Sequence, residues 1–187
     1  IPAQQPEKTD LYEAPEVQDV VALMDALVSP THDLSLARAL KSPLFSVSDD
    51  ALVLIALAAR RAAAQDHPAS WFDLIQKEDF PAPVPATLSA TLRQWKGLVD
   101  TLPPHDALET IYQQADVLAR FAAAAPAPLR GAVLGNLRAL LGAALEVNGG
   151  RYATPYAFVR ALKAGGVRAP ALAAAGGVRL LTVHGAK

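Results

Sequence analysis

The chain has no cysteine among its 187 residues, which excludes disulfide bonds and thiolate metal sites. It also lacks an apolar run close to the ~18–20 residues that a membrane-spanning helix needs. The first residues, Ile1–Gln4, contain neither the basic segment nor the apolar segment of a secretory signal. We therefore expect a cytoplasmic protein that makes no contact with a membrane.

The chain has no excess of either charge. Its 17 Lys and Arg residues nearly balance its 18 Asp and Glu residues, and the formal net charge is −1. An overall basic surface for nucleic acid is therefore absent, so any DNA contact must be local or come from other parts of a larger protein.

The residue patterns of several kinds of active site are missing too. The phosphate-binding pattern G-x-x-x-x-G-K-[ST] does not occur, so the chain cannot cradle a triphosphate by itself. We find no pair of carboxylates with the pattern of a nuclease metal site, and no group of residues typical of a serine or cysteine active site. His32, His67 and His105 lie singly, without a second ligand at helical spacing. We expect no cofactor and no metal in this chain.

Apolar residues at helical spacing dominate from about Glu16 to Gly165 and predict a mainly α-helical bundle. Helix starts are indicated by Pro15 in a first turn, by Asp33 as a cap, by the segment 46–50, by Ser70, and by Thr154 followed by Pro155. Several segments have an apolar stripe, and the longest predicted helix, 129–147, ends at Gly149-Gly150. The stripe residues are Val17, Val20, Val21, Met24, Leu27 and Val28; Leu88, Leu92, Trp95, Val99 and Leu102; Leu108, Ile111 and Tyr112; Val117, Leu118 and Phe121; and Leu134, Leu137, Leu141 and Leu145.

The last ten residues have a different pattern. The run 178–183 is apolar and β-branched, and it predicts a buried strand that carries Thr182, His184 and Lys187 at its carboxyl end, where open α/β sheets place ligand contacts. The segment 1–3 is strand-like as well. Two lone strands are marginal. We therefore expect both to belong to a sheet from another part of a larger protein, with the helical body as an insertion whose ends lie close together.

Several segments, in order along the chain, resemble UvrD/RecB-type superfamily 1 DNA helicases. Thr182-Val183-His184-Gly185-Ala186-Lys187 resembles the first half of motif V, T-x-H-x-A/S-K, which G-L-E follows in the family. The segment 33–45, ending in Ser-Pro-Leu-Phe, resembles D-D-x-A-L-x-x-V-L-x-S-P-L-F of the AddA/RecB branch. The segment 11–20 is similar to the E-V-x-D stretch after motif IV. The segments 135–141 and 156–162 are similar to the A-N-L-x-x-L and F-L/V-x-x-L elements before motif V.

The resemblance implies a fragment of an ATP-dependent DNA helicase or helicase–nuclease, of the exodeoxyribonuclease V type, in double-strand-break repair and recombination. Residues 1–15 would be the edge of the RecA-like 2A domain, 16–170 the helical 2B subdomain, and 171–187 the return to the 2A domain. ATP and Mg would serve the parent protein, and the fragment alone would be inactive. Implied partners are single-stranded and duplex DNA, the other helicase domains and a second subunit of a helicase–nuclease complex.

The resemblance also implies candidate contact residues. Thr182 and His184 would lie on the path of single-stranded DNA, with Lys187 at the edge of the motif. Hydroxyl and imidazole donors suit phosphate oxygens. Lys41, Ser46 and Ser48 flank the place where the UvrD branch uses a Gly-Ile-Gly hairpin on duplex DNA. Because this sequence lacks those glycines, a packing corner is favoured over a duplex or partner contact there.

The remaining candidates for DNA contact each have an ordinary structural alternative. Basic side chains in the helical region could touch phosphates but are more often on solvated faces. Trp71 and Trp95 could stack on bases, yet their stripes favour core packing. A free-standing all-α protein-interaction module without a DNA role stays open as the alternative for the whole chain. The basic residues in question are Arg60, Arg61, Arg151, Arg160, Lys163 and Arg168.

Overall fold

The chain folds mainly into α-helices, as its apolar spacing predicts. The computed structural model describes residues 3–4, 10–77, 80, 82–170 and 178–179. None of the helices in these ranges is long and apolar enough to cross a bilayer. The elements, in order, are β1 (Ala3–Gln4), η1 (Leu11–Glu13), α1 (Pro15–Val28), α2 (Asp33–Lys41), α3 (Asp49–Ala64), α4 (Trp71–Ile75), α5 (Leu88–Thr101), α6 (Pro104–Gln114), α7 (Val117–Ala124), α8 (Arg130–Glu146), η2 (Val147–Tyr152), α9 (Pro155–Ala164) and β2 (Val178–Arg179).

Local capping signals fix where several helices begin. Pro15 lies in the first turn of α1. The side chain of Ser48 accepts a hydrogen bond from the backbone N–H of Ala51 at 3.3 Å at the start of α3. Ser70 and Thr154 accept equivalent bonds at the starts of α4 and α9, each at 3.1 Å. These caps satisfy backbone donors that have no partner inside a helix, and all four predicted starts are confirmed.

The prediction for Asp33 is wrong. Asp33 is the first residue of α2, and the cap position falls on His32, whose side chain makes no capping bond. The Asp33 carboxylate instead accepts a hydrogen bond from the backbone N–H of Trp71, at 2.8 Å. Trp71 is the first residue of α4, so its backbone N–H has no partner within that helix. It pairs with the Asp33 carboxylate, although 38 residues separate the two in sequence.

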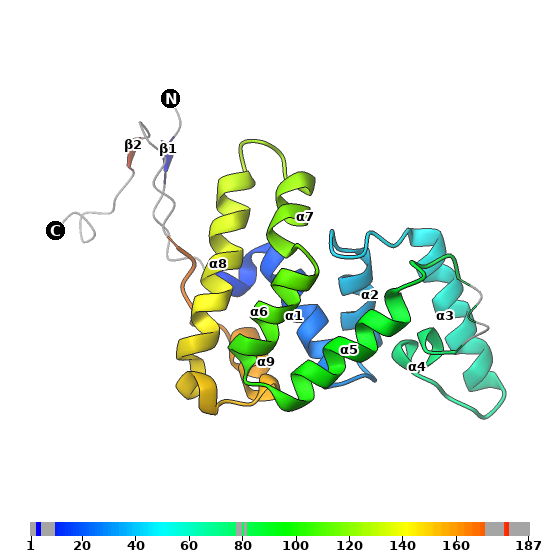
Figure 1. Ribbon diagram of the computed structural model, residues 1–187. Coiled ribbons are helices and arrows are strands. Elements are labelled where there is room, and N and C mark those ends of the chain that lie inside the picture. The colour runs from blue at the N-terminus through cyan, green and yellow to red at the C-terminus, as the bar shows by residue number, and fades with distance from the viewer. Residues whose placement is uncertain (1–2, 5–9, 78–79, 81, 171–177, 180–187) are drawn as a thin grey trace.

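Helix α1 is the centre of the fold. Ten of its fourteen residues are buried, and it packs against α2, α5, α8 and α9 (Figure 1). Its neighbours contribute large side chains with almost no exposed surface, among them Leu36, Leu92 and Phe158. The burial of one helix on nearly all sides explains why its sequence is apolar around most of its circumference.

Helix α8 buries a different stripe from the predicted one. Leu137 is buried as expected, but Leu140 and Ala144 share the buried face, whereas Leu145 is 58% exposed. The helix packs against α6 and α7 and also against α1. Its buried face includes Leu140, Ala143 and Ala144 because neighbours lie on more than one side of the helix. The predicted end of the helix is confirmed, since residues 148–150 all have positive φ.

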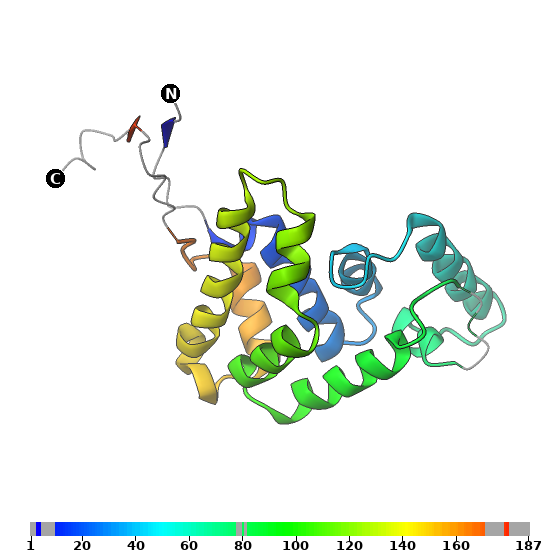
Figure 2. The ribbon, with the colours of Figure 1, turned by 45° about the horizontal axis from the view of Figure 1, so that its top comes forward.

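Helices α3 and α4 form the edge of the molecule farthest from α8 and α9 (Figures 1 and 2). Helix α3 packs chiefly against α4, and α4 also contacts α2. Although α3 has sixteen residues, only Ala51 and Ile55 are buried. It is therefore joined to the rest of the fold by a narrow apolar contact.

The two ends of the helical body meet. The backbone N–H of Leu11 donates to the carbonyl of Val167 at 2.7 Å, and Asp10 forms an antiparallel bridge with Arg168. The Asp10 carboxylate also accepts a hydrogen bond from the backbone N–H of Gly166. The prediction that these ends lie close together is confirmed.

The strand segments outside the helical body pair with each other. Strands β1 and β2 run parallel, with Ala3 opposite Val178 and Gln4 opposite Arg179, and they lie apart from the helices in both views (Figures 1 and 2). The predicted strand 178–183 is thus described at its first two residues, and its remainder lies outside the described residues.

Candidate nucleic-acid interface

The candidate DNA-path residues Thr182, His184 and Lys187 lie outside the described residues. Their role stays a prediction. The other candidate contact residues, Lys41, Ser46 and Ser48, are all exposed and lie at the corner between α2 and α3.

Backbone and side-chain hydrogen bonds hold this corner in one shape. The buried hydroxyl of Ser42 donates to the carbonyl of Ala39 at 2.6 Å and accepts from the backbone N–H of Leu44. The backbone N–H of Val47 donates to the carbonyl of Leu40 at 2.9 Å. The side chains of Leu44 and Val47 are buried, so the corner is anchored in the core. The interpretation of this segment as a packing corner is confirmed.

The charges at the corner do not favour a phosphate backbone. The Lys41 ammonium forms an ion pair with the Asp49 carboxylate at 2.6 Å, and Asp50 adds a second carboxylate in the first turn of α3. Ser48 already uses its hydroxyl as the helix cap. Ser46 has a positive φ of 51° and an exposed side chain. A phosphate at this place would meet two carboxylates close to one lysine, so the charges of the corner do not favour a contact with duplex DNA.

Two pairs of polar side chains surround the start of α1. The side-chain amide of Asn136 donates to the buried carboxylate of Glu16 at 2.8 Å. Arg38 donates through Nε to Asp19 at 2.7 Å. Burial raises the pKa of Asp19, and the nearby Arg38 guanidinium only partly offsets this effect. All four residues belong to segments that carry the helicase resemblance, and the contacts give each of them a structural role.

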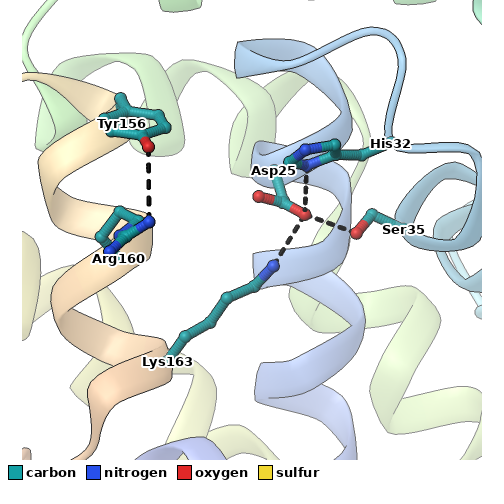
Figure 3. Close-up of polar contacts among 6 residues, drawn as sticks. All are labelled: Asp25, His32, Ser35, Tyr156, Arg160 and Lys163. Atoms are coloured by element: carbon teal, nitrogen blue, oxygen red, sulfur yellow. Dashed lines mark hydrogen bonds and ion pairs between the residues drawn. The ribbon is translucent and has the colours of Figure 1, made fainter.

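A buried carboxylate joins three elements on the other side of α1. Asp25 is 7% exposed, and its Oδ2 accepts hydrogen bonds from His32 Nδ1 at 3.1 Å, Ser35 Oγ at 2.5 Å and Lys163 Nζ at 2.7 Å (Figure 3). Burial by itself raises the pKa of Asp25, but the hydrogen bonds from Lys163, Ser35 and His32 outweigh it and lower the pKa below 3.8. The carboxylate ties α1 to α2 and to α9.

The Asp25 cluster does not have the geometry of a catalytic triad. Ser35 and His32 both bond to the same carboxylate oxygen, and no hydrogen bond joins the serine to the histidine among the described residues. The serine therefore lacks the imidazole partner that activates the nucleophile of a triad. We assign the cluster a structural role.

Sequence reasoning did not find Asp25. In the sequence, His32 has no second ligand at helical spacing, and Lys163 is a candidate phosphate contact. The available signal was a carboxylate inside a continuous apolar run on α1, because buried charges in proteins are almost always paired. The identity of the partners could not be read from the sequence, since Lys163 lies 138 residues away.

The other singled-out side chains have varied surroundings. The guanidinium carbon of Arg160 lies 5.9 Å from the ring centroid of Tyr156 on α9 (Figure 3). Arg60 and Arg61 are exposed on α3, and Arg168 is exposed beside Asp10. The Arg151 side chain lies outside what the structure describes.

The two tryptophans lie in or beside the core. Trp95 is 3% exposed and donates through its indole N–H to Gln114 at 2.8 Å, so its predicted core position is confirmed. Trp71 is half-buried and packs against the same core. Base stacking on Trp95 is excluded by its burial.

No group of three or more His, Cys, Asp or Glu side chains suited to a metal ion occurs in the described part of the chain.

No protein-family model matches the sequence, and no curated protein matches it significantly.

Proposed function

We propose that this chain is the helical 2B-like subdomain of an ATP-dependent DNA helicase or helicase–nuclease, inserted into a RecA-like 2A domain. The observation that carries the proposal is the meeting of the two ends of the helical body at Leu11 and Val167, 2.7 Å apart between N and O. An insertion must leave and rejoin its host domain at neighbouring points. The parallel pairing of β1 with β2 fits the same requirement, because RecA-like domains are built on parallel strands.

The contacts among the resemblance-carrying residues support the proposal further. Glu16 and Asp19 belong to the E-V-x-D-like stretch, and each is bonded to a residue from another helicase-like segment, Asn136 and Arg38 respectively. Glu16 and Asn136 both stand at fixed positions of the family patterns, and they touch in the fold although 120 residues separate them.

In this function the chain contributes contacts rather than chemistry. Thr182 and His184 would donate hydrogen bonds to phosphate oxygens of single-stranded DNA, and Lys187 would add a positive charge beside them. Other domains of the parent would bind ATP and Mg and hydrolyse the nucleotide. The helical body would present its surface to duplex DNA, to the other helicase domains or to a second subunit.

The test uses the longer protein that contains this chain. Thr182→Ala and His184→Ala should each lower DNA-stimulated ATPase and unwinding on the order of tenfold, because a hydrogen bond to a charged group contributes roughly 1.5–3 kcal/mol. Thr101→Ala, which removes an exposed hydroxyl at the end of α5 outside the candidate contact residues, is the matched control and should unwind normally. The chain 1–187 alone should hydrolyse no ATP.

Wild-type unwinding by both variants would remove Thr182 and His184 from the DNA path. A longer protein with no DNA-stimulated ATPase at all would instead favour the alternative, a helical protein-interaction module. The near-neutral charge balance of the chain and the ion-paired Lys41 give that alternative a physical basis.

A further inference from the structure

Helix α3 has an apolar outer face. Ala51 and Ile55 point toward the rest of the fold and are buried. On the opposite side, Val53 is 56% exposed and Leu57 is 41% exposed, and Leu54 beside them is 40% exposed. A helix that is apolar on both sides is usually a buried helix. Here only one side is covered by the described part of the chain, at the edge of the molecule (Figure 2).

The charged residues on this face are arranged symmetrically about its centre. Asp50, Val53, Leu57 and Arg60 follow one another at intervals of three, four and three residues, so they form one stripe along the helix. Asp50 and Arg60 are equally distant in sequence from Ile55, and so are Val53 and Leu57. A rotation by 180° about an axis that is perpendicular to the helix at the level of Ile55 therefore exchanges Asp50 with Arg60 and Val53 with Leu57.

We propose that α3 is a dimerisation helix that packs antiparallel against α3 of a second copy of this chain. In that pair, Asp50 of one copy faces Arg60 of the other, and Val53 faces Leu57. The two-fold axis passes at the level of Ile55, and each contact occurs twice, as an isologous interface requires. The flanking pair Asp49 and Arg61 has the same symmetry, although Asp49 also binds Lys41 of its own chain at 2.6 Å.

Two features of the stripe favour a second copy over duplex DNA. The arginines occupy one end of the helix, while Asp49 and Asp50 occupy the other, so a phosphate backbone along the helix would be repelled at one end. The centre of the stripe is apolar, and it would stay uncovered on a phosphate backbone. An antiparallel copy of α3 covers the apolar centre and pairs the charges at both ends.

The dimer should be weak, because one pair of four-turn helices falls below the roughly 1,200 Å² of a standard protein interface. Sedimentation equilibrium of the chain over a range of concentrations should detect a monomer–dimer equilibrium with a dissociation constant in the micromolar range or above. Arg60→Asp and Asp50→Arg should each weaken association at least about tenfold, because like charges then face each other twice in the dimer.

An equimolar mixture of the two variants provides the decisive comparison. In the mixed dimer, every charged pair again joins an Asp to an Arg, so the mixture should associate while neither variant does so alone. Arg138→Asp, at an exposed position on α8, is the matched control and should dimerise like the wild type. Circular dichroism should show that all variants keep the helical content of the wild type.

Several results would overturn the proposal. One is a wild-type chain that stays monomeric at every concentration, and another is a mixture that stays as monomeric as its components. A third is an Arg60→Asp variant that loses affinity for a duplex oligonucleotide while its association is unchanged, since the arginine would then serve DNA and not a second copy. None of these outcomes depends on the helicase proposal, because the assay measures association of the chain alone.

Discussion

Helices α1 and α3 have similar lengths and a similar abundance of Ala, Leu and Val, but they differ sharply in burial. Helix α1 buries ten of its fourteen residues, whereas α3 buries two of its sixteen. Both sequences would be read as buried helices from their composition. The difference lies in their neighbours, because α1 has four helices around it and α3 has chiefly one. The apolar outer face of a helix at the edge of the fold therefore supports the proposed contact with a second copy, whereas the same composition at the centre indicates only a core.

The largest expected difference between the two regions is in the cost of the same truncation. Leu27→Ala on α1 removes a fully buried side chain and should lower the free energy of unfolding by about 2–5 kcal/mol. Leu57→Ala on α3 should cost at most about 1 kcal/mol, because its side chain is 41% exposed in the monomer. Urea denaturation at low protein concentration, followed by circular dichroism, measures both. Equal losses would mean that α3 is as well packed as α1.

The loss of a buried ion pair should likewise lower the free energy of unfolding more than the loss of an exposed one. Asp25→Asn on α1 removes the charge that Lys163, Ser35 and His32 share, and it should destabilise the protein by about 1.5–3 kcal/mol at neutral pH. Asp49→Asn breaks the Lys41–Asp49 pair on α3, whose side chains are 62% and 72% exposed, and should cost at most about 1 kcal/mol. The same denaturation assay applies. If the exposed pair costs as much as the buried one, the assigned role of Asp25 is wrong.

The contribution of Asp25 should also disappear in acid. Its pKa in the folded protein lies below the ordinary value of 3.8, so the unfolded chain takes up this proton at a higher pH than the folded one does. The carboxylate therefore stabilises the fold above about pH 4, and the effect is lost as the pH falls through the lowered pKa. The stability gap between wild type and Asp25→Asn should narrow below about pH 4. A stability difference between the two proteins that stays constant from pH 7 to pH 2 would contradict an ionised Asp25.

The last contrast compares two glycines, one in the turn that follows α8 and one inside α8. Gly150 has φ of +58°, and an added Cβ would lie 2.0 Å from the carbonyl oxygen of Leu145, so Gly150→Ala should destabilise by about 1–3 kcal/mol. Gly142, inside α8, has no atom within 4 Å of an added Cβ. Gly142→Ala should stabilise by roughly 0.5–1 kcal/mol. Thermal unfolding of the two variants checks the sign of each change, and a Gly150→Ala variant as stable as the wild type would contradict the need for glycine at this turn.

Local signals in the sequence predict most of the helices. Ser48, Ser70 and Thr154 act on backbone groups within three residues, so their patterns can be recognised without the fold. The errors arise where a partner is distant in sequence. Asp33 bonds to Trp71 instead of capping its own helix. The buried face of α8 is set by helices on two sides and so favours Leu140 over Leu145.

The candidate site was less predictable than the helices. The exposed position of Lys41 follows from its place at a helix end, but its ion pair with Asp49 depends on the angle between α2 and α3. The Asp25 cluster contains residues from three elements that only the fold brings together (Figure 3). Thr182, His184 and Lys187 stay predictions from sequence resemblance.

The central claim is that the helical body leaves and rejoins its surroundings at one point. Because the chain has no native cysteine, Glu13→Cys and Arg168→Cys introduce two unique sites for spin labels. Pulsed electron–electron double resonance should give one short, narrow distribution of distances between the two spin labels. A control pair at Glu13→Cys and His67→Cys should give a clearly longer distance, since His67 follows α3 at the far edge. A broad distribution for the first pair, or one as long as the control, would contradict the meeting of the ends and the insertion proposed from it.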